Sequence, residues 1–166
     1  MMVVIGMISA RMVFATPEEM PKPKPGSVEF EKIKSLAGVW KGTTETDGKV
    51  ELAEIDYKVT SMGSAVVETL FPNTPHEMVS IYHDDANGKL SMTHYCAIGN
   101  RPELQLKKSE GNNLALELSP KSELVSEKHM HALNLSFNGA NQLTQSWTCF
   151  EGGKANHTTT LSVKKV

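Results

Sequence analysis

Apolar and polar residues alternate with a period of two through most of the chain after Trp40, a pattern typical of strands with one buried face. Before Trp40, the apolar residues follow helical spacing over residues 28–36, with Ser27 placed to cap the helix and Gly38 to end it. We therefore expect one short helix and then about ten strands. The predicted strands cover residues 39–46, 50–60, 64–71, 77–83, 89–97, 103–108, 113–118, 129–137, 142–150 and 154–164.

The segments between these strands carry hairpin signals. Asn87-Gly88, Asn138-Gly139 and Gly152-Gly153 tolerate the positive φ angles that tight turns require. Nothing after Trp40 has a helical pattern long enough to cover a sheet, so the sheet must close on itself or fold into a sandwich, and up-and-down connectivity favours closure. The sequence thus predicts an all-β fold, a closed antiparallel up-and-down barrel with the short N-terminal helix at one mouth.

The junction of helix and barrel lies at Gly38-Val39-Trp40. Glycine allows a sharp turn between the two kinds of element, and tryptophan supplies a large apolar plug whose N–H needs a partner. We expect Gly38 and Trp40 to be structural residues at the closed end of the barrel.

Strand alternation also predicts which side chains face the lumen. In each strand, alternate residues point inward, and the apolar set of alternate positions should face the lumen. The same set includes several polar or aromatic side chains near one end of their strands, namely His94, His131, Gln145, Trp147 and His157. Leucines and valines fill the other end. A mostly apolar interior with a few convergent polar groups is typical of a small-molecule site. The alternative for each histidine is a neutral rim residue that is bonded to Gln145, Thr159 or water.

Composition argues against several other classes of function. The 166 residues include 17 Lys and Arg against 19 Asp and Glu, a net charge of -2 without blocks of like charge, so we expect no nucleic-acid partner. Cys96 and Cys149 match neither a CxxC motif nor a zinc framework, and are either a disulfide pair or two small buried hydrophobes. His129 and His131 are spaced to share a metal, but the pattern favours two rim residues, so no metal site is expected.

The N-terminus predicts an exported protein. Residues 1–15 form an apolar stretch too short to span a bilayer and end in a small residue, as in a signal peptide, although Arg11 interrupts it. The alternative is an N-terminus that is not a leader. No cysteine follows for a lipid anchor, so we expect a periplasmic or secreted protein without a membrane anchor. Residues 16–27 are a proline-rich linker, and residues 28–166 form the barrel domain.

The run at residues 36–42, together with residues 76–83 and the strand and turn at residues 90–102, resembles the lipocalin-like calycin barrels. The likeness covers residues 30–166 and is greatest to a bacterial family of unknown function with the shape of nitrobindin and fatty-acid-binding proteins. It implies a barrel fold. Lipocalins pair the first-strand tryptophan with an arginine from the last strand, where this chain has only Lys164 and Lys165. Nitrobindin-type barrels bind haem through a late histidine, to which His157 corresponds only by rough position.

These observations favour a non-enzymatic barrel that binds a small, largely apolar or amphiphilic ligand without a cofactor. The predicted ligand-binding residues are His94, Tyr95, Arg101, His131, Gln145, Trp147 and His157. One alternative is a haem-binding barrel with His157 as axial ligand. A second is a small hydrolase or isomerase with His94 as general base, oriented by Glu68 or Gln145. A third is an interaction protein without a ligand.

Overall fold

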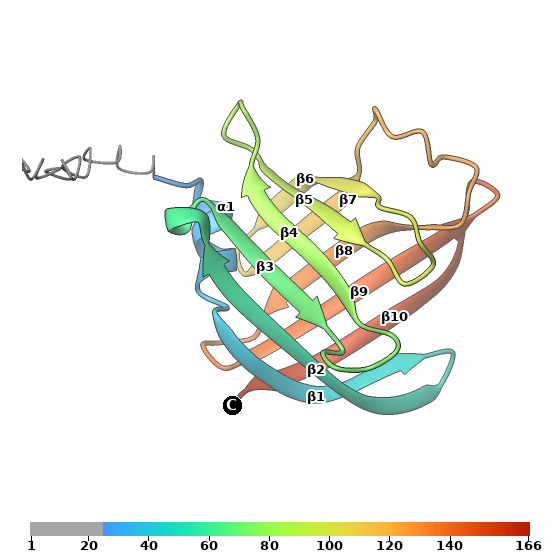
Figure 1. Ribbon diagram of the computed structural model, residues 1–166, viewed down its shortest axis with the longest axis horizontal. Coiled ribbons are helices and arrows are strands. Elements are labelled where there is room, and N and C mark those ends of the chain that lie inside the picture. Colours follow the sequence, from blue (N-terminus) through green and yellow to red (C-terminus); the bar gives the residue numbers. More distant parts are fainter. Residues whose placement is uncertain (1–24) are drawn as a thin grey trace, which may run out of the picture.

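The computed structural model describes residues 25–166 and has the expected all-β architecture. The predicted signal peptide and most of the predicted linker lie outside the described residues. Within residues 25–166, ten antiparallel strands follow a single α-helix and close into a barrel (Figure 1). The elements are α1 (Val28–Lys34), β1 (Gly38–Thr46), β2 (Lys49–Thr60), a 3₁₀ turn (Ser61–Gly63), β3 (Ala65–Leu70), β4 (Met78–Asp84), β5 (Leu90–Tyr95), β6 (Glu103–Glu110), β7 (Asn113–Leu118), β8 (His129–Phe137), β9 (Gln142–Glu151) and β10 (Lys154–Lys165).

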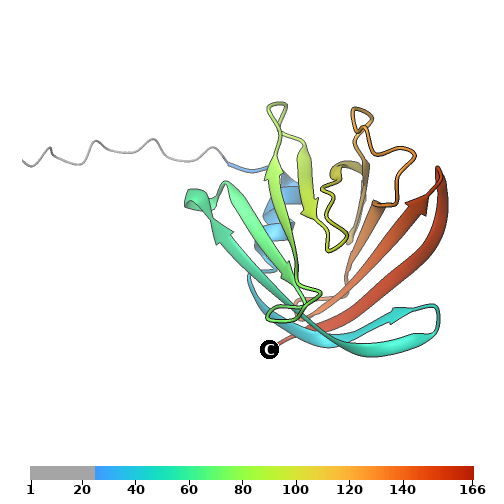
Figure 2. The same cartoon turned by 45° about the vertical axis from the view of Figure 1, so that its right-hand side comes forward.

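The strands follow one another around the barrel in chain order, and β10 pairs with β1 to close it. This up-and-down order gives the barrel two distinct ends. We call the end where β1 begins and β10 ends the helix end, because α1 lies there (Figures 1 and 2). We call the opposite end, where β3, β5 and β9 finish, the mouth.

Helix α1 closes the helix end by apolar packing and by hydrogen bonds at its start. The Ser27 hydroxyl accepts from the backbone N–H of Phe30 at 3.0 Å, as expected of an N-cap. The same hydroxyl donates to Asp84 at the end of β4 at 2.8 Å. Phe30, Ile33 and Leu36 are buried, so the apolar face of the helix and the residues after it form part of the core. The expectation of a short helix across one opening of the barrel is thus confirmed, at the helix end.

Trp40 fills the lumen beside this helix. Its indole N–H donates to the backbone carbonyl of Leu36 at 2.7 Å, and only 1% of its surface is exposed. The Lys165 ammonium lies 5.5 Å from the centre of the indole. Lys165 therefore places a cation over the Trp40 ring.

Two glycines allow β1 to follow this path. Gly38 has a φ of 121°, a value that L side chains rarely adopt. Gly42 lies so close to β10 that an added Cβ would stand 2.0 Å from the Ser162 carbonyl oxygen. The barrel seam between β1 and β10 therefore requires a residue without a side chain at position 42.

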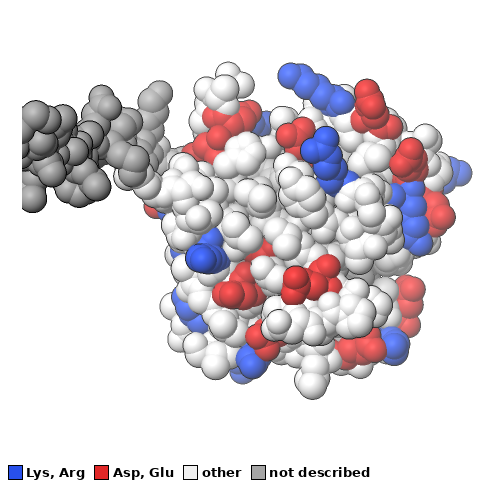
Figure 3. All heavy atoms as spheres, viewed as in Figure 1, with Lys and Arg blue, Asp and Glu red and all other residues white. Residues whose placement is uncertain are grey.

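Apolar side chains fill most of the barrel, and the charged residues other than Glu68 lie on or near its surface. The core includes Ile55, Val66, Leu90, Met92, Leu104, Leu114, Leu116, Leu133, Leu135, Leu143, Leu161 and Val163. On the face in Figure 3, acidic and basic side chains are interspersed. Within residues 25–166, no helix has the length and apolar character needed to cross a membrane.

Candidate functional site

A row of four polar side chains runs around the inner wall of the barrel on neighbouring strands. Tyr57 on β2 lies opposite Glu68 on β3, Glu68 lies opposite Ser80 on β4, and Ser80 lies opposite His94 on β5. All four are buried, with exposed fractions of 0–2%. Because directly opposed side chains in a sheet are close neighbours, this register lets hydrogen bonds pass from one strand to the next.

Glu68 is the centre of this network. The Tyr57 hydroxyl donates to its Oε1 at 2.7 Å, the Tyr82 hydroxyl donates to its Oε2 at 3.1 Å, and the Gln145 amide also donates to Oε1. Burial raises the pKa of Glu68, whereas the hydrogen bonds from Tyr57, Ser80, Gln145 and Tyr82 oppose that rise. Burial and the neighbouring carboxyl raise the pKa of both tyrosines. The tyrosines are therefore proton donors to Glu68.

Gln145 joins this network to Trp147 across the barrel. The indole N–H of Trp147 donates to Oε1 of Gln145 at 2.8 Å. Since the indole nitrogen is a donor only, the amide oxygen must face Trp147 and the amide nitrogen must face Glu68 and Tyr57. Gln145 and Trp147, both predicted from the sequence as site residues, thus belong to one hydrogen-bond network.

His94 lies at the end of the row nearest the mouth. Its Nδ1 is 3.0 Å from the Ser80 hydroxyl, and its ring centre is 4.7 Å from that of Trp147. Its Nε2 is buried and has no hydrogen-bond partner, a condition that only Thr44 and Asn100 share among the side chains of the described residues. Burial lowers the pKa of His94 to about 4, so the imidazole is neutral at neutral pH.

The ring of His94 lines a small apolar cavity at the mouth. The cavity has a volume of about 30 Å³, and its wall consists of Leu70, Phe71, Met78, His94, Met130, Trp147, Thr159 and Leu161. Six of these eight side chains are apolar, and Met78 and Met130 are flexible enough to change its shape. The cavity is therefore an apolar space, and the ring of His94, whose Nε2 is buried without a partner, forms part of its wall.

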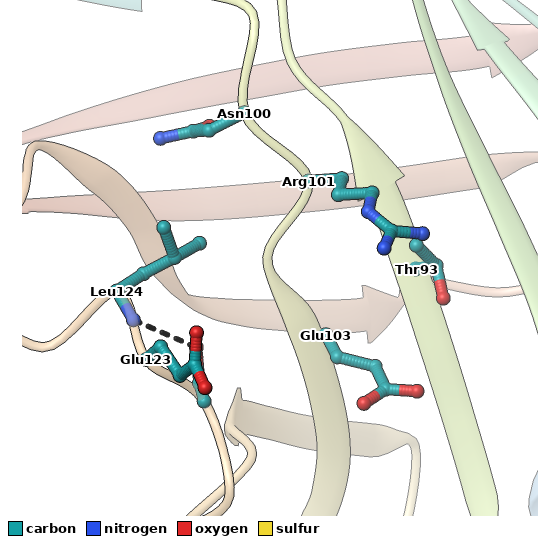
Figure 4. Close-up of a pocket in the computed structure, with 7 residues that line it drawn as sticks. Thr93, Asn100, Arg101, Glu103, Glu123 and Leu124 are labelled. Carbon is teal, nitrogen blue, oxygen red and sulfur yellow. Dashed lines mark hydrogen bonds between the residues drawn. The ribbon is translucent and has the colours of Figure 1, made fainter.

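Tyr95 and Arg101 do not share this space. Tyr95 follows the inward-facing His94 and points outward, with 46% of its surface exposed. Arg101 is exposed and lines a separate groove of about 450 Å³ with Thr93, Glu103 and Leu124 (Figure 4). Thr93 and Glu103 pair on the outer face of β5 and β6, so this groove lies outside the barrel.

His131 also lies on the outer side, because a bulge interrupts the alternation of β8. The register between β8 and β9 shifts between Met130 and Ala132, so Met130 faces the lumen opposite Cys149. The His131 ring instead stacks on Phe150 at 3.7 Å and 10°. Its Nδ1 is 3.0 Å from Nε2 of His129, and burial lowers its pKa. The lumen position predicted for His131 is therefore wrong, and Met130 takes that place.

His157 keeps the predicted inward parity but lies at the rim. It pairs with Cys149 across a register shift in β10 and is half-buried. The residues at the mouth do not fit haem: Trp147 fills the lumen beside His94, and the cavity of about 30 Å³ is far smaller than a macrocycle. The only arginine within residues 25–166, Arg101, lies on the outer groove and not beside His157.

The two cysteines are free thiols. Cys96 is half-buried with its Sγ 4.0 Å from Sδ of Met78, and Cys149 is buried, which raises the pKa of its thiol. In the part of the chain that the structure describes, no three His, Cys, Asp or Glu side chains are placed to hold a metal ion.

Three members of the network were not predicted as site residues: Tyr57, Ser80 and Tyr82. Glu68 entered only as a hypothetical partner of His94, and Ser80 stands between the two. The signal that marks this wall is a single acidic residue in an otherwise apolar segment, Val66-Val67-Glu68-Thr69-Leu70. A buried carboxyl needs several donors, and the tyrosines of adjacent strands and Gln145 supply them.

Comparison with known proteins shows little similarity. No protein-family model matches the chain, and neither does any curated protein. A solved structure similar to it is a protein of unknown function of the DUF3598 family from Nostoc punctiforme, 8% identical, with 84% of this chain and all of that chain covered and a TM-score of 0.27. A TM-score this low carries no argument about function or ancestry. The barrel fold is compatible with ligand binding.

Proposed function

We propose that the barrel binds a small, largely apolar ligand at its mouth, with His94 as the polar contact. The observation that carries this proposal is the buried Nε2 of His94, which has no partner and belongs to a ring in the wall of an apolar cavity. An unsatisfied buried polar atom costs about 1–3 kcal/mol. A ligand that places one polar atom at Nε2 and apolar atoms against the wall would recover that cost.

The cavity limits how much of the ligand enters. A volume of about 30 Å³ has room for one or two water-sized groups. We infer that the polar end of the ligand enters the cavity, whereas its apolar part lies over Phe71, Met78 and Met130. The methionine side chains can rotate to enlarge the space, as flexible thioethers do at adaptable binding surfaces.

Catalysis by His94 is less well supported. The row from Glu68 through Ser80 orients the imidazole, as a general base requires. Burial, however, lowers the pKa of His94 to about 4, which makes it a weak base at neutral pH. The same burial leaves a neutral imidazole whose hydrogen-bonding capacity is available to a ligand. The geometry therefore favours binding over proton transfer.

Two adjacent positions on β10 give a direct test. Thr159 lines the cavity, whereas Thr158 is exposed on the outer face. Native mass spectrometry and solvent extraction of purified wild type should reveal a co-purifying apolar molecule. Thr159→Phe should remove it by filling the cavity, and Thr158→Phe should retain it. Equal retention by both variants, or no bound molecule and no binding of small apolar probes to wild type, would overturn the proposal.

A further inference from the structure

Three sulfur-containing side chains gather at the mouth of the barrel. Met78 on β4 and Met130 on β8 both line the apolar cavity, and Cys96 directly follows β5. The Cys96 Sγ lies 4.0 Å from the Met78 Sδ. All three side chains are half-buried, so an ion can reach them from solvent. Because they come from three separate strands, no local metal-binding motif contains them.

The turn between β5 and β6 fixes the position of Cys96. Its backbone N–H donates to the Asn100 carbonyl at 3.0 Å, and its carbonyl accepts from the Gly99 N–H at 2.9 Å. Cys96 is a free cysteine, as is Cys149, whose Sγ lies 3.6 Å from the carbonyl oxygen of its neighbour Phe150. The thiol of Cys96 is thus directed toward Met78, and that of Cys149 toward the backbone.

The spacing of Cys96 and Met78 fits a metal ion with three ligands. Bonds between a metal ion and thiolate sulfur are about 2.3 Å long. Two such bonds at about 120°, the angle between three ligands in a plane, place their sulfur atoms about 4.0 Å apart. The observed separation is 4.0 Å, so neither strand has to move. Met130 can supply the third sulfur, because it lines the same cavity and its thioether side chain is flexible.

The type and charge of these ligands select the ion. Thiolate and thioether sulfur are soft ligands that suit Cu(I), whereas zinc sites are built from cysteine, histidine and carboxylates. The wall of the cavity contains no carboxylate. On metal binding, the Cys96 thiol releases its proton to solvent, so the thiolate and a monovalent ion together are neutral. A divalent ion would keep a positive charge beside an apolar wall, which is costly.

From this arrangement we infer that the mouth of the barrel binds one Cu(I) ion through Sγ of Cys96 and Sδ of Met78 and Met130. The inference goes beyond the proposed apolar ligand and does not depend on it. It also differs from the metal sites made of histidine, cysteine and carboxylates, because two of its three ligands are thioethers.

Titration of the full chain with Cu(I) tests the site. The protein is kept under a non-thiol reductant without oxygen, and a chromogenic chelator competes for the ion. Wild type should bind one equivalent. Residues that only orient a metal ligand change metal affinity by about 10–100-fold, so loss of a ligand itself in Cys96→Ala or Met78→Leu should weaken binding at least about tenfold.

Each variant has a matched control. Cys149→Ala removes the other thiol of the barrel and should keep the wild-type affinity. Met92→Leu makes the same change as Met78→Leu but in the core, because Met92 is buried on β5 and does not line the cavity. It too should keep the wild-type affinity. Leucine has nearly the volume of methionine, so both methionine variants are expected to fold.

X-ray absorption at the copper edge of the loaded wild type identifies the ligands without any variant. It should show two or three sulfur atoms at about 2.3 Å. Absence of saturable binding, or a shell of nitrogen and oxygen alone, would overturn the inference. Equal affinities of Met78→Leu and Met92→Leu, or a loss in Cys149→Ala equal to that in Cys96→Ala, would also overturn it. None of these results bears on the apolar ligand, whose co-purification is measured without copper.

Discussion

The barrel has a buried tryptophan near each end, and the two are held in different ways. Trp40, at the helix end, donates its N–H to the backbone carbonyl of Leu36 and lies under the Lys165 ammonium. Trp147, toward the mouth, donates to the side chain of Gln145 and contacts the ring of His94. The first is held by backbone and apolar contacts, whereas the second belongs to a chain of polar side chains.

Under the proposed function, this difference separates the residues that stabilise the fold from those that bind the ligand. At the helix end, α1 covers the lumen and every polar atom of Trp40 has a partner. At the mouth, mostly apolar side chains surround a small cavity, and Nε2 of His94 is left unpaired. We therefore expect changes at the helix end to alter the free energy of unfolding alone, and changes at the mouth to alter ligand binding as well.

The largest effect should come from removing the plug at the helix end. Trp40→Ala deletes a side chain that is 1% exposed and is expected to lower the free energy of unfolding by about 3–5 kcal/mol. Urea denaturation measures this loss. In the fraction that stays folded, the NMR signals of the His94 imidazole should be unchanged. A loss below about 1 kcal/mol, or a shifted His94 signal, would contradict the proposed separation of the two ends.

Acid should weaken the mouth through His94. Its pKa falls from 6.5 to about 4 on folding. Between pH 6.5 and about pH 4, the imidazole is therefore protonated in the unfolded chain but neutral in the folded protein. This contribution to stability is present above pH 6.5 and is lost as pH falls toward 4, and the shift corresponds to about 3 kcal/mol. Glu68 acts in the opposite sense, because burial raises its pKa.

The comparison of wild type with His94→Gln isolates the histidine, since Glu68 is present in both. Urea unfolding at neutral pH and near pH 4 should show a smaller loss on acidification in the variant than in wild type. An NMR titration of the imidazole gives the pKa directly. A midpoint near 6.5, or the same acid dependence in both proteins, would show that His94 is not buried as described.

A matched pair of substitutions at the two tryptophans sharpens the comparison further. Trp40→Phe and Trp147→Phe each remove one indole N–H hydrogen bond, so each should lower the free energy of unfolding by about 1–2 kcal/mol. Only Trp147 contacts the ring of His94, so only Trp147→Phe should shift the NMR signals of the His94 imidazole. Equal shifts of the His94 signals in both variants would contradict the separation of the two ends.

The barrel could be predicted because its determinants are local. Alternation with a period of two, glycine at the turns and the capped helix at Ser27 each lie within a few residues, and the observed strands follow the predicted ones within about three residues. Gly38 and Trp40 also lie where the local pattern placed them, at the closed end.

The polar wall could not be predicted in the same way, because the rule that the apolar parity faces inward fails where the interior itself is polar. On β4, Ser80 and Tyr82 face the lumen while Val79 and Ile81 face outward. The bulge in β8 reverses the parity at His131 and depends on pairing with β9, which no single segment encodes. Gln145, Trp147 and His94 were found because their own strands alternate without interruption.

The smallest expected effect comes from removing the Lys165 ammonium that lies over the Trp40 ring. Lys165→Met keeps the length and apolar stem of the side chain but removes the ammonium that lies 5.5 Å from the centre of the indole. A cation above an aromatic ring contributes about 0.5–1 kcal/mol, and the same half-buried ammonium donates to the Ser35 carbonyl at 3.3 Å, so the variant should lose about 1 kcal/mol in urea denaturation at low salt. Lys164→Met is the matched control, because Lys164 is exposed on the outer face of the same strand and has no such ring beside it. Because Gly38 lies against the Lys165 stem, the stem itself must be retained for the measurement to report the charge alone. Equal stability of the two variants would show that apolar contact with the stem, rather than the cation, closes the helix end.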